Sequence, residues 1–210
     1  MSFPTLETEL ELLEKFDAVI GVDEVGRGAL AGPVAVGAFV FTSNLADGQP
    51  PGLKDSKLIS ETKRPNIAAE VKAWGAGSVG LSSVEEIEAE GISIALRNAA
   101  LRAIRELEFP SAVVLLDGTH NWLGHIQVPV VTRPKADRDC GSVAAASVLA
   151  KVHRDDLMKE LANDFPEFGW ESNKGYSSSD HIEKIRSLGP SEHHRKSWLT
   201  KILSADQGLF

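Results

Sequence analysis

The stretch that decides the fold is AVIGVDEVGRGALAGPVAVGAFVF, residues 18–41. It contains two runs rich in apolar and β-branched residues, 18–22 and 34–41, with glycine and proline between them. Apolar runs of this length, bounded by such residues, are typical of strands. The stretch therefore predicts two strands that form a hairpin, joined by a glycine-rich turn.

The turn region carries a compact set of polar residues. Asp23 and Glu24 stand where the first strand is expected to end, and Gly26, Arg27 and Gly28 follow closely. Consecutive side chains on a strand point to opposite faces, so both acids can serve one site only where the strand ends or is distorted. Glycines here would let backbone N–H groups approach a phosphate while Arg27 adds charge. The alternative is a tight turn with a solvated arginine.

The rest of the chain alternates between strand and helix patterns, which predicts a mixed α/β fold. We expect further strands at 73–83, at 111–118 and around Pro129. We expect helices at 60–74, 83–107, 143–164 and 179–188. Gly91 should break the second helix, Ser142 should cap the third, and Pro129 favours an edge strand because it lacks an N–H group.

Composition sets the broad class of the protein. The chain has 210 residues, of which 42% are hydrophobic and 25% charged, as expected for one globular domain. It has neither an apolar run of the roughly 20 residues that span a bilayer nor a signal-peptide pattern, so we expect a cytoplasmic protein without a membrane partner. Cys140, the single cysteine, excludes an internal disulfide and a cysteine-rich zinc site, and we expect it to be buried. The net charge of −8 argues against a nucleic-acid partner on average but allows a local basic face.

Acids at strand ends and in one loop suggest carboxylates that converge above the sheet. The candidates are Asp23, Glu24, Asp117 and one of Asp137 or Asp139. Four such groups would repel one another and force at least one pKa upward unless cations balance them. Oxygen ligands favour two Mg²⁺ or Mn²⁺ ions, which would activate a water and stabilise the leaving oxygen of a phosphodiester. Each acid taken alone could instead be a solvated strand-end or helix-capping residue.

Ordered motifs along the chain carry a family resemblance. GVDEVGRGALAGPV, residues 21–34, resembles the signature of type 2 ribonuclease H, ribonuclease HII. The further matches, in the order of that family, are LKDSKLIS, LLDG, KADRDCGSVAAASVLAKVHRDDLM, NKGYSSSDH and HHRKSWL. The similarity therefore runs from about Val19 to Leu199. Type 3 enzymes have an additional N-terminal domain before the acidic signature, and only 22 residues precede Asp23 here, which favours type 2.

The resemblance implies a ribonuclease H-like fold, with a central mixed β-sheet flanked by helices and a small C-terminal helical segment. It implies one catalytic domain over residues 1–210, in which about 170–210 form a helical substrate-binding extension. It also implies an endonuclease that cuts the RNA strand of RNA–DNA hybrids and ribonucleotides embedded in duplex DNA. Cutting on the 5′ side of the ribonucleotide, with two Mg²⁺ or Mn²⁺ ions, would leave 3′-hydroxyl and 5′-phosphate ends. We expect a monomer with roles in ribonucleotide excision and DNA replication and repair.

The resemblance also assigns the metal-binding acids. Asp23 and Glu24 match the first two and Asp117 the third. The segment KAD at 135–137 matches the usual lysine–glycine–aspartate of the family. This match selects Asp137 as the fourth acid, with Asp139 left as a solvated loop residue.

Substrate contacts are carried over in the same way. Gly26, Arg27 and Gly28 match the loop that grips the ribonucleotide and recognises its 2′-hydroxyl, and Tyr176 matches a tyrosine that packs on the next sugar. The residues that match phosphate contacts are Lys54, Ser56, Lys57, Ser147 and Lys151.

The chain departs from the family pattern at a few positions, among them Val25 and Ala29, where alanine and proline are usual. Ser177 stands where KGYG is usual, and it would be strained if that glycine needs a positive φ. Cys140 replaces a serine, so no essential hydroxyl is expected there.

Two other functions remain to be weighed. A metal-free acid–base ribonuclease could use His193 and His194 near Lys196, but it would leave the acids unexplained. His181 is instead expected to support the loop that carries Tyr176, called the tyrosine loop below. A module that binds hybrids or nucleotide phosphates without cutting them would use only the glycine loop, which is formed by Gly26, Arg27 and Gly28. Metal-dependent cleavage distinguishes the enzyme from this module.

Overall fold

The computed structural model describes residues 3–204 of the chain, and within them the strands form one mixed sheet. The strands are β1 (Ala18–Val25), β2 (Val34–Phe41), β3 (Gly77–Ser82), β4 (Ala112–Asp117) and β5 (Val130–Arg133). Their order across the sheet is β3-β2-β1-β4-β5. The pairs β1–β2 and β2–β3 are antiparallel, and the pairs β1–β4 and β4–β5 are parallel. The predicted hairpin and the predicted edge strand after Pro129 are both confirmed.

The first strand is longer than its apolar run. β1 continues to Val25, so Asp23 and Glu24 lie within its last residues, paired with β2. Its parallel pairing with β4 ends at Val22 opposite Leu116. The next residue on β4 is Asp117, so the acids of both strands come together at the carboxyl ends of β1 and β4.

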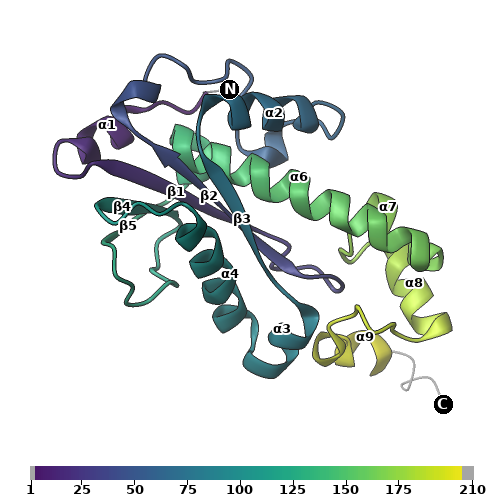
Figure 1. Cartoon of the computed structure of the whole chain (residues 1–210). Helices are drawn as coiled ribbons and strands as arrows, with labels where there is room; N and C mark the ends of the chain where they lie inside the picture. The colour runs from purple at the N-terminus through teal and green to yellow at the C-terminus, as the bar shows by residue number, and fades with distance from the viewer. Residues whose placement is uncertain (1–2, 205–210) are drawn as a thin grey trace.

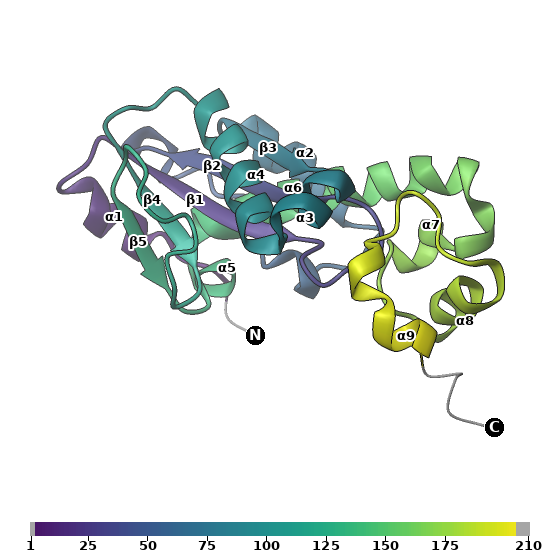
Figure 2. The same cartoon turned by 90° about the horizontal axis from the view of Figure 1, so that it is seen from below.

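Helices cover both faces of this sheet (Figures 1 and 2). Those described are α1 (Glu7–Leu13), α2 (Arg64–Trp74), α3 (Val84–Glu90), α4 (Ile92–Glu106), α5 (Ala136–Asp139), α6 (Gly141–Asp164), α7 (Trp170–Asn173), α8 (Ser179–Leu188) and α9 (Thr200–Ser204). One apolar core joins the sheet to α2 and α6, and a second joins its other face to α4. Gly91 separates α3 from α4 as predicted, whereas α2 begins at Arg64 rather than at residue 60.

The central helix α6 lies unusually close to the strands. A Cβ atom added at Gly37 of β2 would stand 2.1 Å from the carbonyl oxygen of Ala146. Only glycine permits this approach, because the neighbour is backbone and cannot move aside. On the helix side of this contact, Ala144, Ala145 and Ala146 of α6 are all fully buried, and their small side chains allow the same close packing.

The N-terminus of α6 is capped by a residue from another helix. Ser142 was predicted to cap it, which is wrong: Cys140 is the residue before the helix, and its side chain accepts no capping hydrogen bond. The backbone N–H and the hydroxyl of Ser142 donate to Oε1 of Glu9 at 2.8 and 2.7 Å. Burial raises the pKa of Glu9, and its Oε2 has no hydrogen-bond partner within residues 3–204. A buried acid on α1 therefore satisfies the free donors that begin α6.

The C-terminal helices α7, α8 and α9 gather at one end of the molecule (Figure 2). They share a third apolar cluster with α6 and with the segment after the glycine loop. Its buried members are Leu30, Ala31, Met158, Phe168, Trp170, Ile185 and Leu199. The predicted extension over about 170–210 ends outside the described residues. Cys140 is buried as expected, and within residues 3–204 every helix is too short or too polar to cross a bilayer.

Replacing Glu9 with alanine should destabilise the fold. The substitution leaves the buried N–H and hydroxyl of Ser142 without an acceptor, which typically costs about 1–3 kcal/mol. Urea unfolding at pH 7 measures this loss. Glu11→Ala, an exposed position on the same helix, is the control and should change stability by less than about 0.5 kcal/mol. Equal stability of the two variants would contradict the capping role.

Candidate active site

Three elements bring the predicted acids together. Asp23 and Glu24 end β1, Asp117 ends the neighbouring parallel strand β4, and Asp137 lies in the short helix α5. The backbone N–H of Asp137 donates to Oδ1 of Asp117 at 3.3 Å. Asp139 turns elsewhere, because both its carboxylate oxygens accept from Arg138, at 2.7 and 2.9 Å. The carboxylate of Asp137 is therefore the one that faces the strand-end acids.

The acids influence one another electrically. Asp23 is only 4% exposed, and burial together with the neighbouring carboxylates of Glu24 and Asp137 raises its pKa to about 8. Burial and the nearby Asp117 likewise raise the pKa of Asp137. The expectation that crowding forces at least one pKa upward is confirmed, although burial is the largest cause.

A lysine supplies positive charge to this cluster. Nζ of Lys57 stands 3.5 Å from Oδ2 of Asp137. Burial opposes the charged form of Lys57, but Asp55, Asp23 and Asp137 outweigh it and raise the lysine pKa. Lys57 therefore partly balances the acids as the side chains stand.

The donor set fits hard divalent cations by its chemistry. Asp23, Glu24, Asp117 and Asp137 offer carboxylate oxygens only, which suit Mg²⁺ and Mn²⁺. No group of three or more His, Cys, Asp or Glu side chains within residues 3–204 is already arranged around an ion position.

The glycine loop lies next to the tyrosine predicted to join it. The N–H of Gly26 donates to the hydroxyl of Tyr176 at 3.1 Å, across 150 residues of sequence. Gly26 has φ +83°, and a Cβ there would stand 2.1 Å from Nε of Arg154, so this position requires glycine. Arg27 is exposed and lies 3.6 Å from Glu24, which connects the loop to the acids.

Two fully buried arginines hold the loop from behind. Arg195 donates to the carbonyl oxygens of Gly26, Arg27 and Gly32 at 2.8–3.2 Å. Arg154 donates to those of Ala31, Pro33 and Lys174 at 2.8–3.0 Å. Both are 0% exposed. The sequence analysis assigned them no role. They lie in the motifs KVHRDDLM and HHRKSWL, but nothing in a pattern distinguishes a buried arginine from a solvated one.

The residues predicted to contact phosphate differ in their burial and in the partners they contact. The hydroxyl of Ser147 donates to Oγ of Ser56 at 2.9 Å and lies close enough to Asp23 to lower the pKa of that acid; both serines are buried. Lys151 pairs with Asp155 at 2.6 Å and stands 5.9 Å from the ring of Tyr176. Lys54 lies over the ring of Phe3 at 4.3 Å, and no described contact joins it to the acids.

The tyrosine loop shows no strain at its unusual serine. Positive φ angles occur at Lys174 and Gly175, and the φ of Ser177 is not positive. The glycine usual at that position is therefore not needed for backbone conformation here.

A buried pair of histidines supports the tyrosine loop, as expected for His181. Its Nδ1 donates to the carbonyl oxygen of Tyr176 at 2.8 Å, and its Nε2 accepts from Nε1 of Trp170 at 3.0 Å. His194 accepts the N–H of Ser191 on Nδ1 at 3.0 Å, which leaves its ring proton on Nε2, 3.1 Å from Nε2 of His181. These bonds require both rings to be neutral. Burial lowers the pKa of His194 to about 4, so this ring is a structural group and a poor general base.

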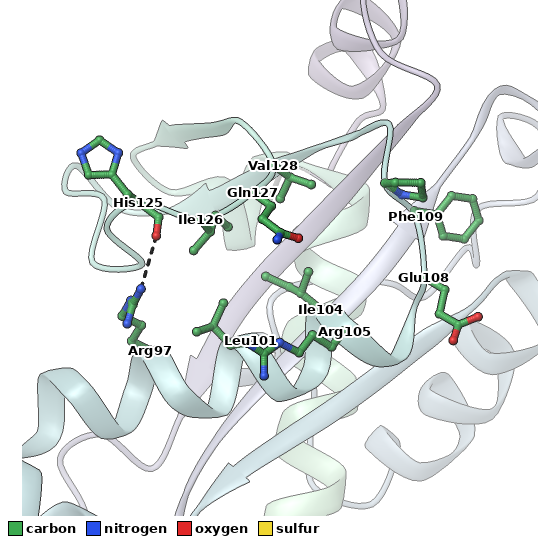
Figure 3. A pocket seen from close by; sticks show the side chains of 11 residues that line it. Arg97, Leu101, Ile104, Arg105, Glu108, Phe109, His125, Ile126, Gln127 and Val128 are labelled. Carbon is green, nitrogen blue, oxygen red and sulfur yellow. Dashed lines mark hydrogen bonds between the residues drawn. The ribbon is translucent and has the colours of Figure 1, made fainter.

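A cavity of about 610 Å³ lies between α4 and the segment before β5, away from the acids (Figure 3). Leu101, Ile104, Ile126 and Val128 give it an apolar lining. Arg97 closes one side by donating to the carbonyl oxygen of His125 at 3.3 Å. None of its lining residues belongs to the acid cluster or the glycine loop, so it is not the catalytic cleft.

Comparison with known proteins places the chain in a family. The family model described as Ribonuclease HII matches residues 20–201. The chain belongs to the ribonuclease HII family. It is 44% identical over 196 residues to the ribonuclease HII of Streptomyces coelicolor, covering 92% of this chain and 82% of that protein. It is 45% identical over 184 residues to that of Roseobacter denitrificans, covering 86% and 89%.

Solved structures of this family share the fold. Ribonuclease H2 from Pyrococcus horikoshii matches with a TM-score of 0.71 and 25% identity, over 91% of this chain and 100% of that one. The ribonuclease HII solved in a PCNA complex from Archaeoglobus fulgidus matches with a TM-score of 0.69 and 27% identity, over 86% and 95%. The ribonuclease H-like fold is thus confirmed, and membership of this family makes the chain a type 2 ribonuclease H, a hydrolase.

Acid should lower the stability of this protein through the histidine pair. Unfolded histidine takes up a proton below about pH 6.5, whereas buried His194 does so only near pH 4. Stability present above pH 6.5 is therefore lost as the pH falls toward 4. Between pH 7 and pH 5, the free energy of unfolding measured in urea should fall by about 2 kcal/mol more in the wild type than in His194→Gln.

The control for this experiment is His153→Gln, at an exposed position on α6. It should behave as the wild type does. If His194→Gln loses as much stability between the two pH values as the wild type, His194 is not the group that titrates.

Proposed function

We propose that this chain is an endonuclease that hydrolyses the RNA strand of RNA–DNA hybrids and cuts on the 5′ side of ribonucleotides embedded in duplex DNA. The products would carry 3′-hydroxyl and 5′-phosphate ends. The observation that supports this best is the meeting of three elements: strand-end acids, the glycine loop and the tyrosine loop. Family membership supplies the general activity, and this juxtaposition supports the choice of substrate.

The acids would hold two Mg²⁺ or Mn²⁺ ions. Asp23 and Asp117 end adjacent strands, and Glu24 and Asp137 flank them. When bound, such ions activate a water for in-line attack and stabilise the departing 3′-oxygen. The pKa of Asp23 is high because burial and the neighbouring acids disfavour its charged form. A bound cation would restore that charged form.

The loop would recognise the ribose. Arg27 and Gly28 are exposed, and their backbone N–H groups have no acceptor within residues 3–204. The ring of Tyr176 is half-buried beside them, held by Gly26. An N–H group free to bind a 2′-hydroxyl lets a protein distinguish RNA from DNA at one nucleotide.

The remaining matched residues would act at the phosphate backbone in two ways. Lys57, Lys151 and Lys54 carry charge that would give salt-sensitive affinity for phosphates. Ser56 and Ser147 are buried, so we propose that they act indirectly by orienting Asp23 and the segment that carries Lys57.

We further propose that the C-terminal helices form the substrate-binding extension of a single catalytic domain. Their apolar cluster and the pair His181–His194 fix the tyrosine loop against the glycine loop. The enzyme would act as a monomer in ribonucleotide excision during DNA replication and repair.

A DNA duplex with one internal ribonucleotide tests the proposed function. Cleavage should require Mg²⁺ or Mn²⁺ and occur once, on the 5′ side of the ribonucleotide. The products should carry a 3′-hydroxyl, which a polymerase extends. An all-DNA duplex should remain intact. A cyclic phosphate end, or equal cleavage with chelator present, would contradict metal-dependent hydrolysis.

Substitution of Asp137 and Asp139 tests the choice of the fourth acid. Asp137→Asn should lower kcat by roughly a hundredfold or more, since it removes a charged ligand of the reacting centre, while duplex affinity changes little. Asp139→Asn is the matched control two residues away and should retain activity. Full activity of Asp137→Asn, with duplex binding intact, would show that Asp137 is not the fourth acid.

A further inference from the structure

The peptide groups of the glycine loop are fixed by a buried cation. The guanidinium of Arg195 donates to the carbonyl oxygen of Gly26 at 2.8 Å and to that of Arg27 at 2.9 Å. These two oxygens belong to the peptide groups that also carry the N–H of Arg27 and the N–H of Gly28. One side chain thus binds two successive peptide groups of the loop.

Peptide geometry sets the direction of the opposite ends. A trans peptide holds its C=O and its N–H on opposite sides, and the described chain has no cis peptide bond. When Arg195 pulls both oxygens inward, the N–H groups of Arg27 and Gly28 must point away from it. Those two residues are exposed, and their N–H groups are the unpaired ones.

The arrangement is held rigidly on the buried side. Arg195 is 0% exposed, it donates twice more to Gly32, and its Cζ lies 4.8 Å from the ring of Trp198. Its own backbone N–H donates to the carbonyl oxygen of Leu30 at 2.8 Å. Arg154 fills the space beside Gly26 and fixes the far end of the loop through Ala31. The described hydrogen bonds of both guanidinium groups all go to backbone carbonyls, so their positive charge adds to the potential of the outward N–H groups.

We propose that Arg195 is a positioning residue for ribonucleotide recognition: by fixing the peptide groups 26–27 and 27–28, it presents the N–H groups of Arg27 and Gly28 to the 2′-hydroxyl and the adjacent phosphate. This inference rests on the proposed function of the loop. Lysine cannot replace the guanidinium, because a single ammonium lacks the planar fork that reaches two carbonyls in fixed directions.

The test compares binding rather than cleavage. All proteins carry Asp117→Asn to prevent cutting, and fluorescence anisotropy in Mg²⁺ gives Kd for a duplex with one ribonucleotide and for the same duplex in DNA only. Discrimination is the Kd for the all-DNA duplex divided by the Kd for the duplex with one ribonucleotide. Arg195→Lys should reduce this ratio about tenfold, with the Kd for the all-DNA duplex within about twofold of its starting value.

A matched control comes from another arginine that holds a loop. Arg97 donates to the carbonyl oxygen of His125 (Figure 3) and to that of Leu123, and neither of these bonds involves the glycine loop. Arg97→Lys should leave the discrimination ratio unchanged. A merely structural effect of Arg195→Lys would weaken binding of both duplexes alike, and that result would overturn the proposal.

The outcomes separate this inference from the function beneath it. If the parent protein does not prefer the ribonucleotide duplex, the proposed function of the loop fails. If the parent discriminates and Arg195→Lys discriminates equally well, only the role of Arg195 fails. Should Arg195→Lys not fold by circular dichroism, Trp198→Leu loosens the same guanidinium and should reduce the ratio severalfold, and an unchanged ratio there would overturn the proposal.

Discussion

The parallel pairing of β1 with β4 is the constraint on which the site depends. It stops at Val22 and Leu116, and the acids Asp23 and Asp117 come directly after. A shift of one residue in either strand would turn its acid toward the opposite face of the sheet. The antiparallel partner β2 fixes this register from the other side, and the close approach of α6 at Gly37 holds the strands against one helix. Packing far from the chemistry thus sets the position of the carboxylates.

The same packing places charge where water is scarce. Asp23 is buried beside other acids, and its raised pKa measures how strongly the site disfavours an uncompensated carboxylate. Lys57 offsets part of that charge from the short helical turn Ser56–Leu58, whereas divalent cations would offset more of it. A site that is electrostatically incomplete in the protein alone is one that favours cations and, with them, the phosphates of a nucleic acid.

The substrate side of the site depends on backbone rather than on side chains. The glycine loop makes its polar contacts through peptide groups, and buried arginines and the hydroxyl of Tyr176 determine where those groups point. Tyr176 is in turn fixed by His181 through its carbonyl oxygen. The C-terminal helices therefore connect to the glycine loop by a short chain of hydrogen bonds, so their packing would matter for the recognition proposed above.

The sequence by itself determined the hairpin, the break at Gly91, the edge strand after Pro129 and the strand-end position of the acids, because apolar periodicity, glycine and proline act locally. Motif order identified the family. Only the tertiary structure decided that Glu9 rather than Ser142 caps α6, and that Ser56 and Ser147 lie inside. It also decided that Arg154 and Arg195 lie beneath the glycine loop. These residues act on partners up to 169 positions away, and no local pattern encodes which polar side chain finds a buried partner once the chain has folded.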